Sequence, residues 1–203
     1  QRVAAAEHLS AHRIGIGLAS ARTLKARGWR VLATARKPAD LERLNLDEGL
    51  ETIPLELSDS QSIAACAEEA LRLTGGRLDA LYNNAAYGIV GAMEDTTADV
   101  LQDHLQVNVI AAHDLTRRIV PAMRRQGHGR IVMCSSVLGF MSGPFRGAYC
   151  ASKFALEAMS DAYRLELRPA NIRVSLIEPG PIESEFLATA IAKFKAHIEA
   201  GTS

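Results

Sequence analysis

Short apolar segments alternate with longer amphipathic segments, and this alternation constrains the fold more than any other feature of the sequence. Five apolar runs are typical of buried strands: residues 29–35, 51–57, 77–84, 129–136 and 172–180. Residues 2–9 stand where a first strand belongs, but this segment is rich in alanine and contains Glu7 and His8. The sequence therefore predicts the first strand only poorly.

Helical patterns fill the intervals between these runs, at residues 17–28, 58–76, 97–127 and 148–169. Strands that alternate with helices predict a parallel sheet with helices on both faces. We therefore expect an α/β protein with a Rossmann-like doubly wound sheet in three layers, formed by one domain over residues 1–203. An amphipathic stretch, residues 182–200, follows Pro181, and we expect the C-terminal strand of such a sheet to be missing.

The charge and composition of the chain limit the kinds of partner that we expect it to bind. The chain has 23 basic and 23 acidic residues, so its net charge of zero gives no reason to expect nucleic acid or an anionic membrane. No apolar run reaches the about 18 residues of a membrane span. The sequence shows no secretion signal, and the three cysteines suit reduced thiols, so we expect a cytoplasmic protein. His8 and His12 do not make a metal site, since zinc needs three or four ligands.

Polar residues follow three of the predicted strands: Asn83-Asn84, Ser135-Ser136 and Pro179-Gly180. Ligands of open parallel sheets bind at the carboxyl ends of the strands, which is where these residues fall. Ordinary turn chemistry explains any one of them taken alone.

The pair Tyr149 and Lys153 adds an acid–base group. The two residues are four apart at the start of a predicted helix, so they share a face, and Tyr149 lies 13 residues after Ser136. A neighbouring ammonium stabilises a phenolate, so we expect Lys153 to lower the pKa of Tyr149. A hydroxyl from Ser136 can then hold a substrate oxygen beside the phenol.

With these motifs in order, the chain from Ser10 to Phe186 resembles the short-chain dehydrogenase/reductase family. The Tyr-x-x-x-Lys motif of that family matches Tyr149 and Lys153, and its catalytic serine matches Ser136 rather than Ser135. The other matches are its catalytic asparagine at Asn108, its Asn-Asn-Ala-Gly motif at Asn83-Asn84-Ala85-Ala86, the aspartate of its fourth strand at Asp79 and its Pro-Gly segment at Pro179-Gly180. Within the family, residues 83–95 and 144–167 look similar to the branch of 17β-hydroxysteroid and retinol dehydrogenases.

The resemblance implies hydride transfer between a nicotinamide cofactor and a carbonyl carbon. Tyr149 would protonate the alkoxide, Ser136 would orient and polarise the carbonyl, and Asn108 would hold a water that links Lys153 to solvent. Lys153 would also bind the ribose beside the nicotinamide. Further cofactor positions implied by the family are Glu56 at the adenine and Ile182 and Ser184 at the nicotinamide carboxamide. The remaining cofactor positions are Leu57, Asn83, Ala85, Pro179 and Gly180.

The cofactor loop aligns with the family pattern as Ser10, Ala11, His12, Arg13, Ile14, Gly15, Ile16 and Gly17. Gly15, Ile16 and Gly17 keep the second half of the pattern, where helix amide groups favour an anionic pyrophosphate. Ala11 departs from it, because the permissive backbone of glycine is lost there.

The charge after the second strand favours NADP(H), with NAD(H) as the alternative. An NAD-specific fold carries an acidic residue about 20 positions after the glycines. Here Arg36 and Lys37 occupy that region, so Arg36, with Arg13, can pair with a 2′-phosphate. A solvated turn is the other interpretation of Arg36 and Lys37.

The substrate is less closely specified. Residues 139–145 and 182–194 are apolar and flank the expected crevice, which suggests a hydrophobic ketone or secondary alcohol such as a steroid, retinoid or aliphatic carbonyl. Two alternatives stay open: a catalytically impaired dinucleotide-binding scaffold, and a reductase of imines or enones. The family also implies a homodimer or homotetramer built through residues 101–122 and 148–167.

Overall fold

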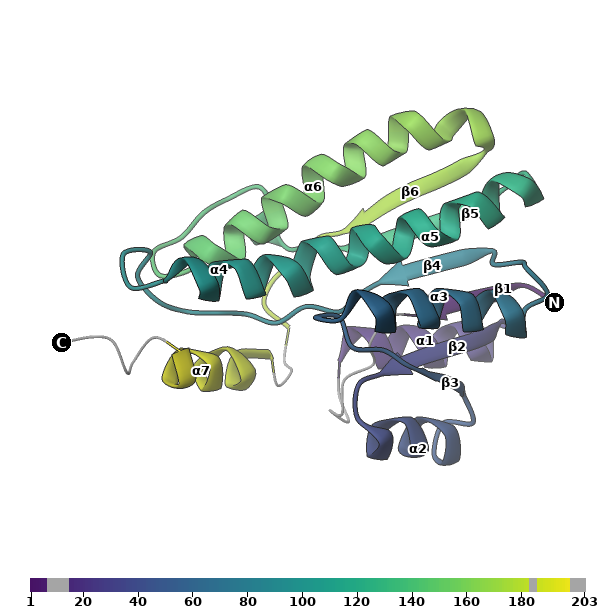
Figure 1. Cartoon of the computed structure of the whole chain (residues 1–203), viewed down its shortest axis with the longest axis horizontal. Helices are drawn as coiled ribbons and strands as arrows, with labels where there is room; N and C mark the ends of the chain where they lie inside the picture. The colour runs from purple at the N-terminus through teal and green to yellow at the C-terminus, as the bar shows by residue number, and fades with distance from the viewer. Residues whose placement is uncertain (7–14, 183–185, 198–203) are drawn as a thin grey trace.

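The computed structural model describes residues 1–6, 15–182 and 186–197, and it contains one six-stranded parallel sheet (Figure 1). The strands are β1 Val3–Ala6, β2 Arg30–Ala35, β3 Glu51–Pro54, β4 Ala80–Asn83, β5 Gly129–Cys134 and β6 Ile172–Ile177. Their order in the sheet is β3-β2-β1-β4-β5-β6. The order reverses beside β1, and this is the place where doubly wound sheets open a crevice for a ligand.

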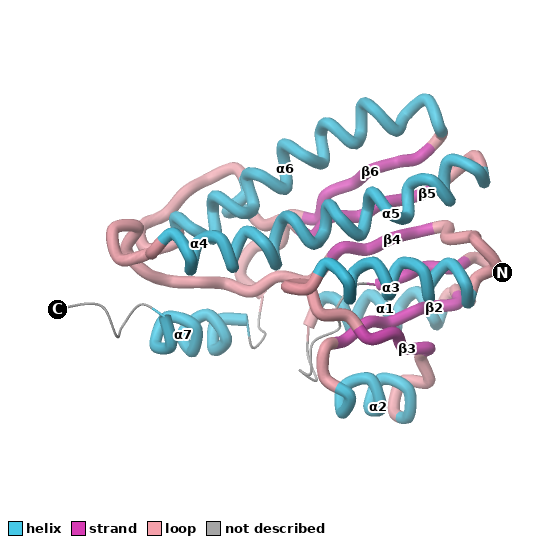
Figure 2. The backbone as a smooth tube through the Cα atoms, viewed as in Figure 1, coloured by secondary structure: helices cyan, strands magenta, loops and turns pink. Residues whose placement is uncertain are grey.

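Helices cover both faces of the sheet, as the tube in Figure 2 also shows. They are α1 Ile16–Ala26, α2 Pro38–Leu46, α3 Ser60–Leu73, α4 Ala98–Leu105, α5 Ala111–Gln126, α6 Gly147–Leu167 and α7 Phe186–His197. Short helical turns add η1 Gln106–Ile110, η2 Val137–Gly139 and η3 Arg168–Ala170. Helices α3, α5 and α6 lie over one face, while α1 lies behind the sheet in the view of Figure 1.

The alternation of side chains along the strands separates two apolar cores, one on each face. Leu32 of β2 belongs to the core that α3, α5 and α6 cover. Its neighbours Val31 and Ala33 belong to the other core, together with Leu18 of α1 and Leu44 of α2. Successive residues of a strand point to opposite faces, so a central strand must be apolar throughout. The predicted three-layer architecture is therefore confirmed.

Strand β1 forms although its sequence is a poor strand candidate. It lies in the middle of the sheet, where Ala4 and Ala5 pair with Val31 and Leu32 on one side and with β4 on the other. The Asp79 carboxylate accepts a hydrogen bond of 2.7 Å from the backbone N–H of Val3. Tertiary pairing thus overrides the weak local propensity of the alanines.

Two helical features are absent from the sequence prediction. Helix α2 begins with Pro38 as one of its first two residues, a position that proline favours, and it buries Leu44. The predicted helix over residues 97–127 is divided by η1, which is a π-helical turn. Such turns occur often at functional sites, and η1 contains Asn108.

Among the residues that the structure describes, no helix combines the length and the apolar character that crossing a bilayer requires.

Candidate functional site

Ser136 lies where the carboxyl ends of β5 and β6 meet. The Ser135 amide donates to the Ile177 carbonyl at 2.8 Å, and the Val137 amide donates to the Pro179 carbonyl at 3.1 Å. These two bonds hold the predicted Pro179-Gly180 segment beside Ser136. The Ser136 hydroxyl accepts from the Leu138 amide at 3.2 Å and begins the turn η2.

Tyr149 and Lys153 project from the first turns of α6 and are both buried. The Lys153 ammonium is only 2 % exposed and donates to the Cys134 carbonyl, at the end of β5, over 2.6 Å. It lies 5.7 Å from the centre of the Tyr149 ring. Since a buried ammonium is costly unless it has partners, this carbonyl stabilises the cation beside the phenol.

Burial raises the pKa of Tyr149 to about 12, and a hydrogen bond with the Ser136 side chain opposes that rise. The pairing of Tyr149 with Lys153 predicts a lowered pKa for the phenol, but the pKa is raised. The reason is that the loss of water around the buried phenol is the largest effect on its pKa. The phenol is therefore protonated at neutral pH and can donate a proton. The contact joins the phenol to the side chain of Ser136.

Asn108 is almost completely buried in η1, at 1 % exposure. Its Oδ1 accepts from the Tyr87 amide at 3.1 Å, and its Nδ2 donates to the Tyr87 carbonyl at 2.9 Å. The same Nδ2 lies 3.1 Å from His104 Nε2 and 3.3 Å from Ser152 Oγ, one residue before Lys153. These contacts connect the loop after β4, helix α4 and helix α6 through a single side chain.

The beginning of α1 fits an anionic pyrophosphate. Gly15 is the N-cap residue, a glycine has no side chain with which to cap the helix, and the first turn contains no acidic residue. A Cβ built at Gly15 would meet no described atom within 4 Å. Ile16 and Gly17 form that turn, and amide groups in such a position bind phosphates. The predicted residues Ser10 and Arg13, like Ala11 and the His8–His12 pair, lie outside the described residues.

Arg36 and Glu56 come together beyond the carboxyl ends of β2 and β3. Arg36 Nε lies 3.7 Å from Glu56 Oε2, and both side chains are partly exposed. Glu56 Oε1 accepts from the Ser58 amide and hydroxyl, which fixes the carboxylate. Exposed ion pairs of this kind are weak, so Arg36 can leave Glu56 for a stronger anion. Leu57 is buried in the core next to Glu56.

The Asn83 side chain does not face the crevice. It is buried at 3 % exposure, and its Nδ2 donates to Thr116 Oγ1 of α5 at 2.9 Å. Any contact of this position with a cofactor would have to come from its backbone. Ala85 packs against the main apolar core instead of projecting into solvent.

Large apolar side chains close in sequence to the catalytic residues are exposed. Phe140, Met141 and Phe145 follow Ser136 along the chain, and Ile182 follows Pro179-Gly180. Phe145 has a backbone φ of 59°, which is uncommon for an aromatic residue, and its carbonyl accepts from the Gly91 amide at 3.1 Å. The predicted residue Ser184 lies outside the described residues.

Sequence reasoning missed Tyr87 and His104, which both contact Asn108. The one available indication is that His104 stands four residues before Asn108, on the same helical face. Tyr87 contributes its backbone, which leaves no mark in the sequence.

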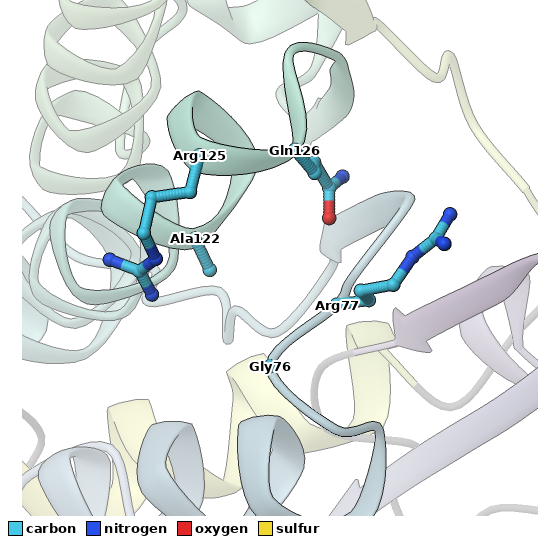
Figure 3. Close-up of a pocket in the computed structure, with 5 residues that line it drawn as sticks. All are labelled: Gly76, Arg77, Ala122, Arg125 and Gln126. Atoms are coloured by element: carbon cyan, nitrogen blue, oxygen red, sulfur yellow. The ribbon is translucent and has the colours of Figure 1, made fainter.

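A separate pocket of about 320 Å³ lies at the opposite edge of the sheet, between Gly76-Arg77 and the end of α5 (Figure 3). Arg77 and Arg125 line it together with Ala122 and Gln126, and their side chains extend away from one another in Figure 3. Because the guanidinium groups diverge, they do not form a converging site. The pocket has no residue in common with the Ser136–Tyr149 region.

Comparison with known proteins agrees with the motifs. The family model described as "short chain dehydrogenase" matches residues 11–194. The chain is 48 % identical over 172 residues to the uncharacterized oxidoreductase YbbO of Escherichia coli K12, covering 85 % of this chain and 64 % of that protein. It is 41 % identical over 138 residues to human 17-beta-hydroxysteroid dehydrogenase type 1, covering 68 % of this chain and 41 % of that enzyme. It thus spans less than two thirds of each of these two relatives.

The fold agrees with solved structures as well. A short-chain dehydrogenase from Streptomyces avermitilis superposes with a TM-score of 0.85 at 34 % identity, covering 91 % of this chain and 68 % of that one.

Proposed function

Since the chain belongs to the short-chain dehydrogenase family, we propose that it is an NADP(H)-dependent oxidoreductase that interconverts a carbonyl and a secondary alcohol. The observation that carries this proposal is the buried group formed by Ser136, Tyr149 and Lys153. It contains a protonated phenol in contact with a serine hydroxyl and beside an ammonium. This arrangement suits the transfer of one proton to an oxygen that becomes negatively charged.

Each catalytic residue has a role that its surroundings support. The Ser136 hydroxyl holds the carbonyl oxygen of the substrate, and Tyr149 Oη gives its proton to that oxygen as the alcohol forms. Lys153 stabilises the phenolate that remains, and its bond to Cys134 keeps the ammonium in place. Asn108 holds the first part of α6 through Ser152 and has the polarity to bind a water next to Lys153. Bound NADPH supplies the hydride that adds to the carbonyl carbon.

The cofactor residues follow from the same placement. Gly15, Ile16 and Gly17 offer amide groups to the pyrophosphate, and Arg36 pairs with the 2′-phosphate after leaving Glu56. The Pro179 carbonyl accepts from the Val137 amide next to Ser136, and we expect Pro179, Gly180 and Ile182 to contact the nicotinamide, which has to reach the carbonyl. NAD(H) has no 2′-phosphate, so it would gain nothing from Arg36, and we therefore assign NADP(H).

The substrate we propose is hydrophobic. Phe140, Met141 and Phe145 lie in the chain between Ser136 and Tyr149 and are exposed, and a steroid-like, retinoid-like or aliphatic chain would remove their surfaces from water. The human relative, 17-beta-hydroxysteroid dehydrogenase type 1, is named for a steroid alcohol, which is compatible with this class. The family resemblance also supports a homo-oligomer built through α5 and α6.

A panel of ketones, imines and enones, each assayed with NADPH and with NADH, tests the proposal. We expect consumption of NADPH at 340 nm with an apolar ketone and little with imines or enones. Turnover confined to imines or enones would favour the alternative reductase. Binding of NADPH without turnover of any substrate would favour the impaired scaffold.

A further inference from the structure

The side-chain amide of Asn108 has only one orientation that its surroundings allow. Tyr87 presents both its backbone N–H and its carbonyl, which lie 3.1 Å from Oδ1 and 2.9 Å from Nδ2 of Asn108. Rotating the amide by 180° would set NH₂ against N–H and oxygen against oxygen. The Tyr87 backbone therefore fixes which end of the amide is the donor.

This orientation determines the protonation of a neighbouring histidine. Asn108 Nδ2, which can only donate, lies 3.1 Å from His104 Nε2. One of the two Nδ2 hydrogens goes to the Tyr87 carbonyl, and the other is shared between His104 Nε2 and Ser152 Oγ, which lies at 3.3 Å. The imidazole nitrogen therefore accepts, so the ring is neutral and carries its proton on Nδ1. His104 is fully buried, with no exposed surface.

We propose that His104 is a positioning residue for Asn108, which it holds only as the neutral Nδ1–H tautomer, so that the site loses its geometry in acid. The inference rests on the proposed function for its kinetic part, because it assigns Asn108 to the catalytic group. Its structural part, the tautomer, stands independently of any activity.

The groups that face His104 come from three elements. Tyr87, on the loop after β4, packs its ring edge-on at 4.8 Å between ring centres, and Tyr149 of α6 lies at 6.2 Å. The Lys153 ammonium, one turn further along α6, is a cation in the same region. Asp103 adjoins His104 on α4, and its charge contributes, after burial, to the raised pKa of Tyr87. Both tyrosines are neutral at neutral pH, so the charges named here near the imidazole are those of Lys153 and Asp103.

A fall in pH weakens the hydrogen bond between His104 and Asn108. A proton added at Nε2 makes that nitrogen a donor, and it then faces the NH₂ of Asn108. The hydrogen bond is replaced by repulsion between two donors inside a buried site, which is costly. Asn108, and through it Ser152 at the start of α6, lose the arrangement beside Lys153. Activity therefore decreases as His104 becomes protonated and returns when the pH is raised.

The first experiment is a long-range ¹H–¹⁵N NMR spectrum of the histidine side chains, with His104→Gln used to assign the resonance. We expect His104 at pH 7 to show an unprotonated Nε2 and a protonated Nδ1. A spectrum with Nε2 protonated at that pH would overturn the proposal, whatever the enzymatic activity.

The second experiment compares pH profiles of kcat for three variants. In His104→Gln the side-chain oxygen can still accept from Asn108 but does not titrate, so we expect kcat at pH 7 within a few-fold of wild type and no acid limb from this residue. His104→Leu removes the acceptor, and we expect kcat to decrease about tenfold, in line with the loss of one buried hydrogen bond. His113→Gln is the matched control, since His113 stands five residues after Asn108 and its ring contacts Tyr163, further along α6 than Ser152.

An acid limb that is identical in wild type and His104→Gln would refute the kinetic part, as would full activity in His104→Leu. A wild-type protein inactive on the whole substrate panel would instead count against the proposed function, and the NMR result would still decide the tautomer.

Discussion

At the scale of single residues, the phenol of Tyr149 is the group on which the proposed chemistry depends. Burial raises its pKa to about 12 and the contact with Ser136 counteracts part of that rise. The proton therefore stays on the phenol throughout the neutral range and leaves only when a negative oxygen forms next to it. A sequence shows that Tyr149 and Lys153 share a helical face, but the extent of burial, which decides the sign of the shift, depends on the whole fold.

The role of the Arg36 charge in NADPH binding can be tested separately from the catalytic residues. We expect Arg36→Glu to weaken NADPH binding roughly 10- to 100-fold, the effect of a charge-assisted hydrogen bond, while NADH binding changes little. Fluorescence titration with both cofactors measures this. Arg27→Glu makes the same change of charge at the exposed end of α1 and is the control. Equal weakening of NADPH binding by the two variants would contradict a specific role for Arg36.

At the scale of elements, the sequence predicts those strands and helices whose own pattern is strong. Five strands, α1, α3 and α6 agree with their apolar periodicity to within a few residues. Strand β1 is different, because its alanines become a strand through pairing with β2 and β4 on both sides. The apolar periodicity of the sequence also does not predict the π-helical turn η1, in which Asn108 accepts a hydrogen bond from the Tyr87 amide.

The residues of the candidate site also fall into those that the sequence places correctly relative to one another and those that it does not. Ser136, Tyr149, Lys153 and Pro179 could be placed together from sequence, because strand ends and helix starts meet at one edge of the sheet. The sequence does not predict that Asn83 binds Thr116 or that His104 contacts Asn108. These partners are distant from one another along the chain or on a packed helix face, and only the folded structure brings their side chains into contact.

Asp79 links β1 to β4 and gives a prediction for stability. Burial raises its pKa, but hydrogen bonds from the Val3 amide and from His128 outweigh that effect and hold the pKa below its usual range. We expect Asp79→Ala to lower the free energy of unfolding by about 1–3 kcal/mol at pH 7 in urea denaturation. Because the folded pKa is depressed, this contribution is complete above the unfolded value of about 3.9 and is lost as pH falls through the folded value.

The control for Asp79 is Asp161→Ala, which removes an exposed ion pair with Arg164 and should change stability by less than about 1 kcal/mol. If the two variants were equally stable at pH 7, Asp79 would not be the link that holds β1.

At the scale of the whole molecule, η1 and α6 present apolar side chains to solvent in the region where the family resemblance implies an interface. Phe154 is 44 % and Leu165 73 % exposed on α6, and Ile110 is exposed where η1 meets α5. We expect the protein to be a dimer or tetramer by light scattering, and Phe154→Glu to shift it to smaller species. Leu46→Glu, on α2 away from these helices, should leave the mass unchanged. A monomeric wild type would show that these side chains do not form an interface.

The substitution Tyr149→Phe, measured for turnover and for NADPH binding on the same preparation, tests the central claim most directly. It removes the hydroxyl that would give the proton and leaves the ring that fills the buried space. We expect turnover of an apolar ketone to decrease by about 10²–10⁴, the usual contribution of a general acid, while NADPH binds as in wild type. Near-normal turnover in this variant would contradict the assignment of Tyr149 as the proton donor.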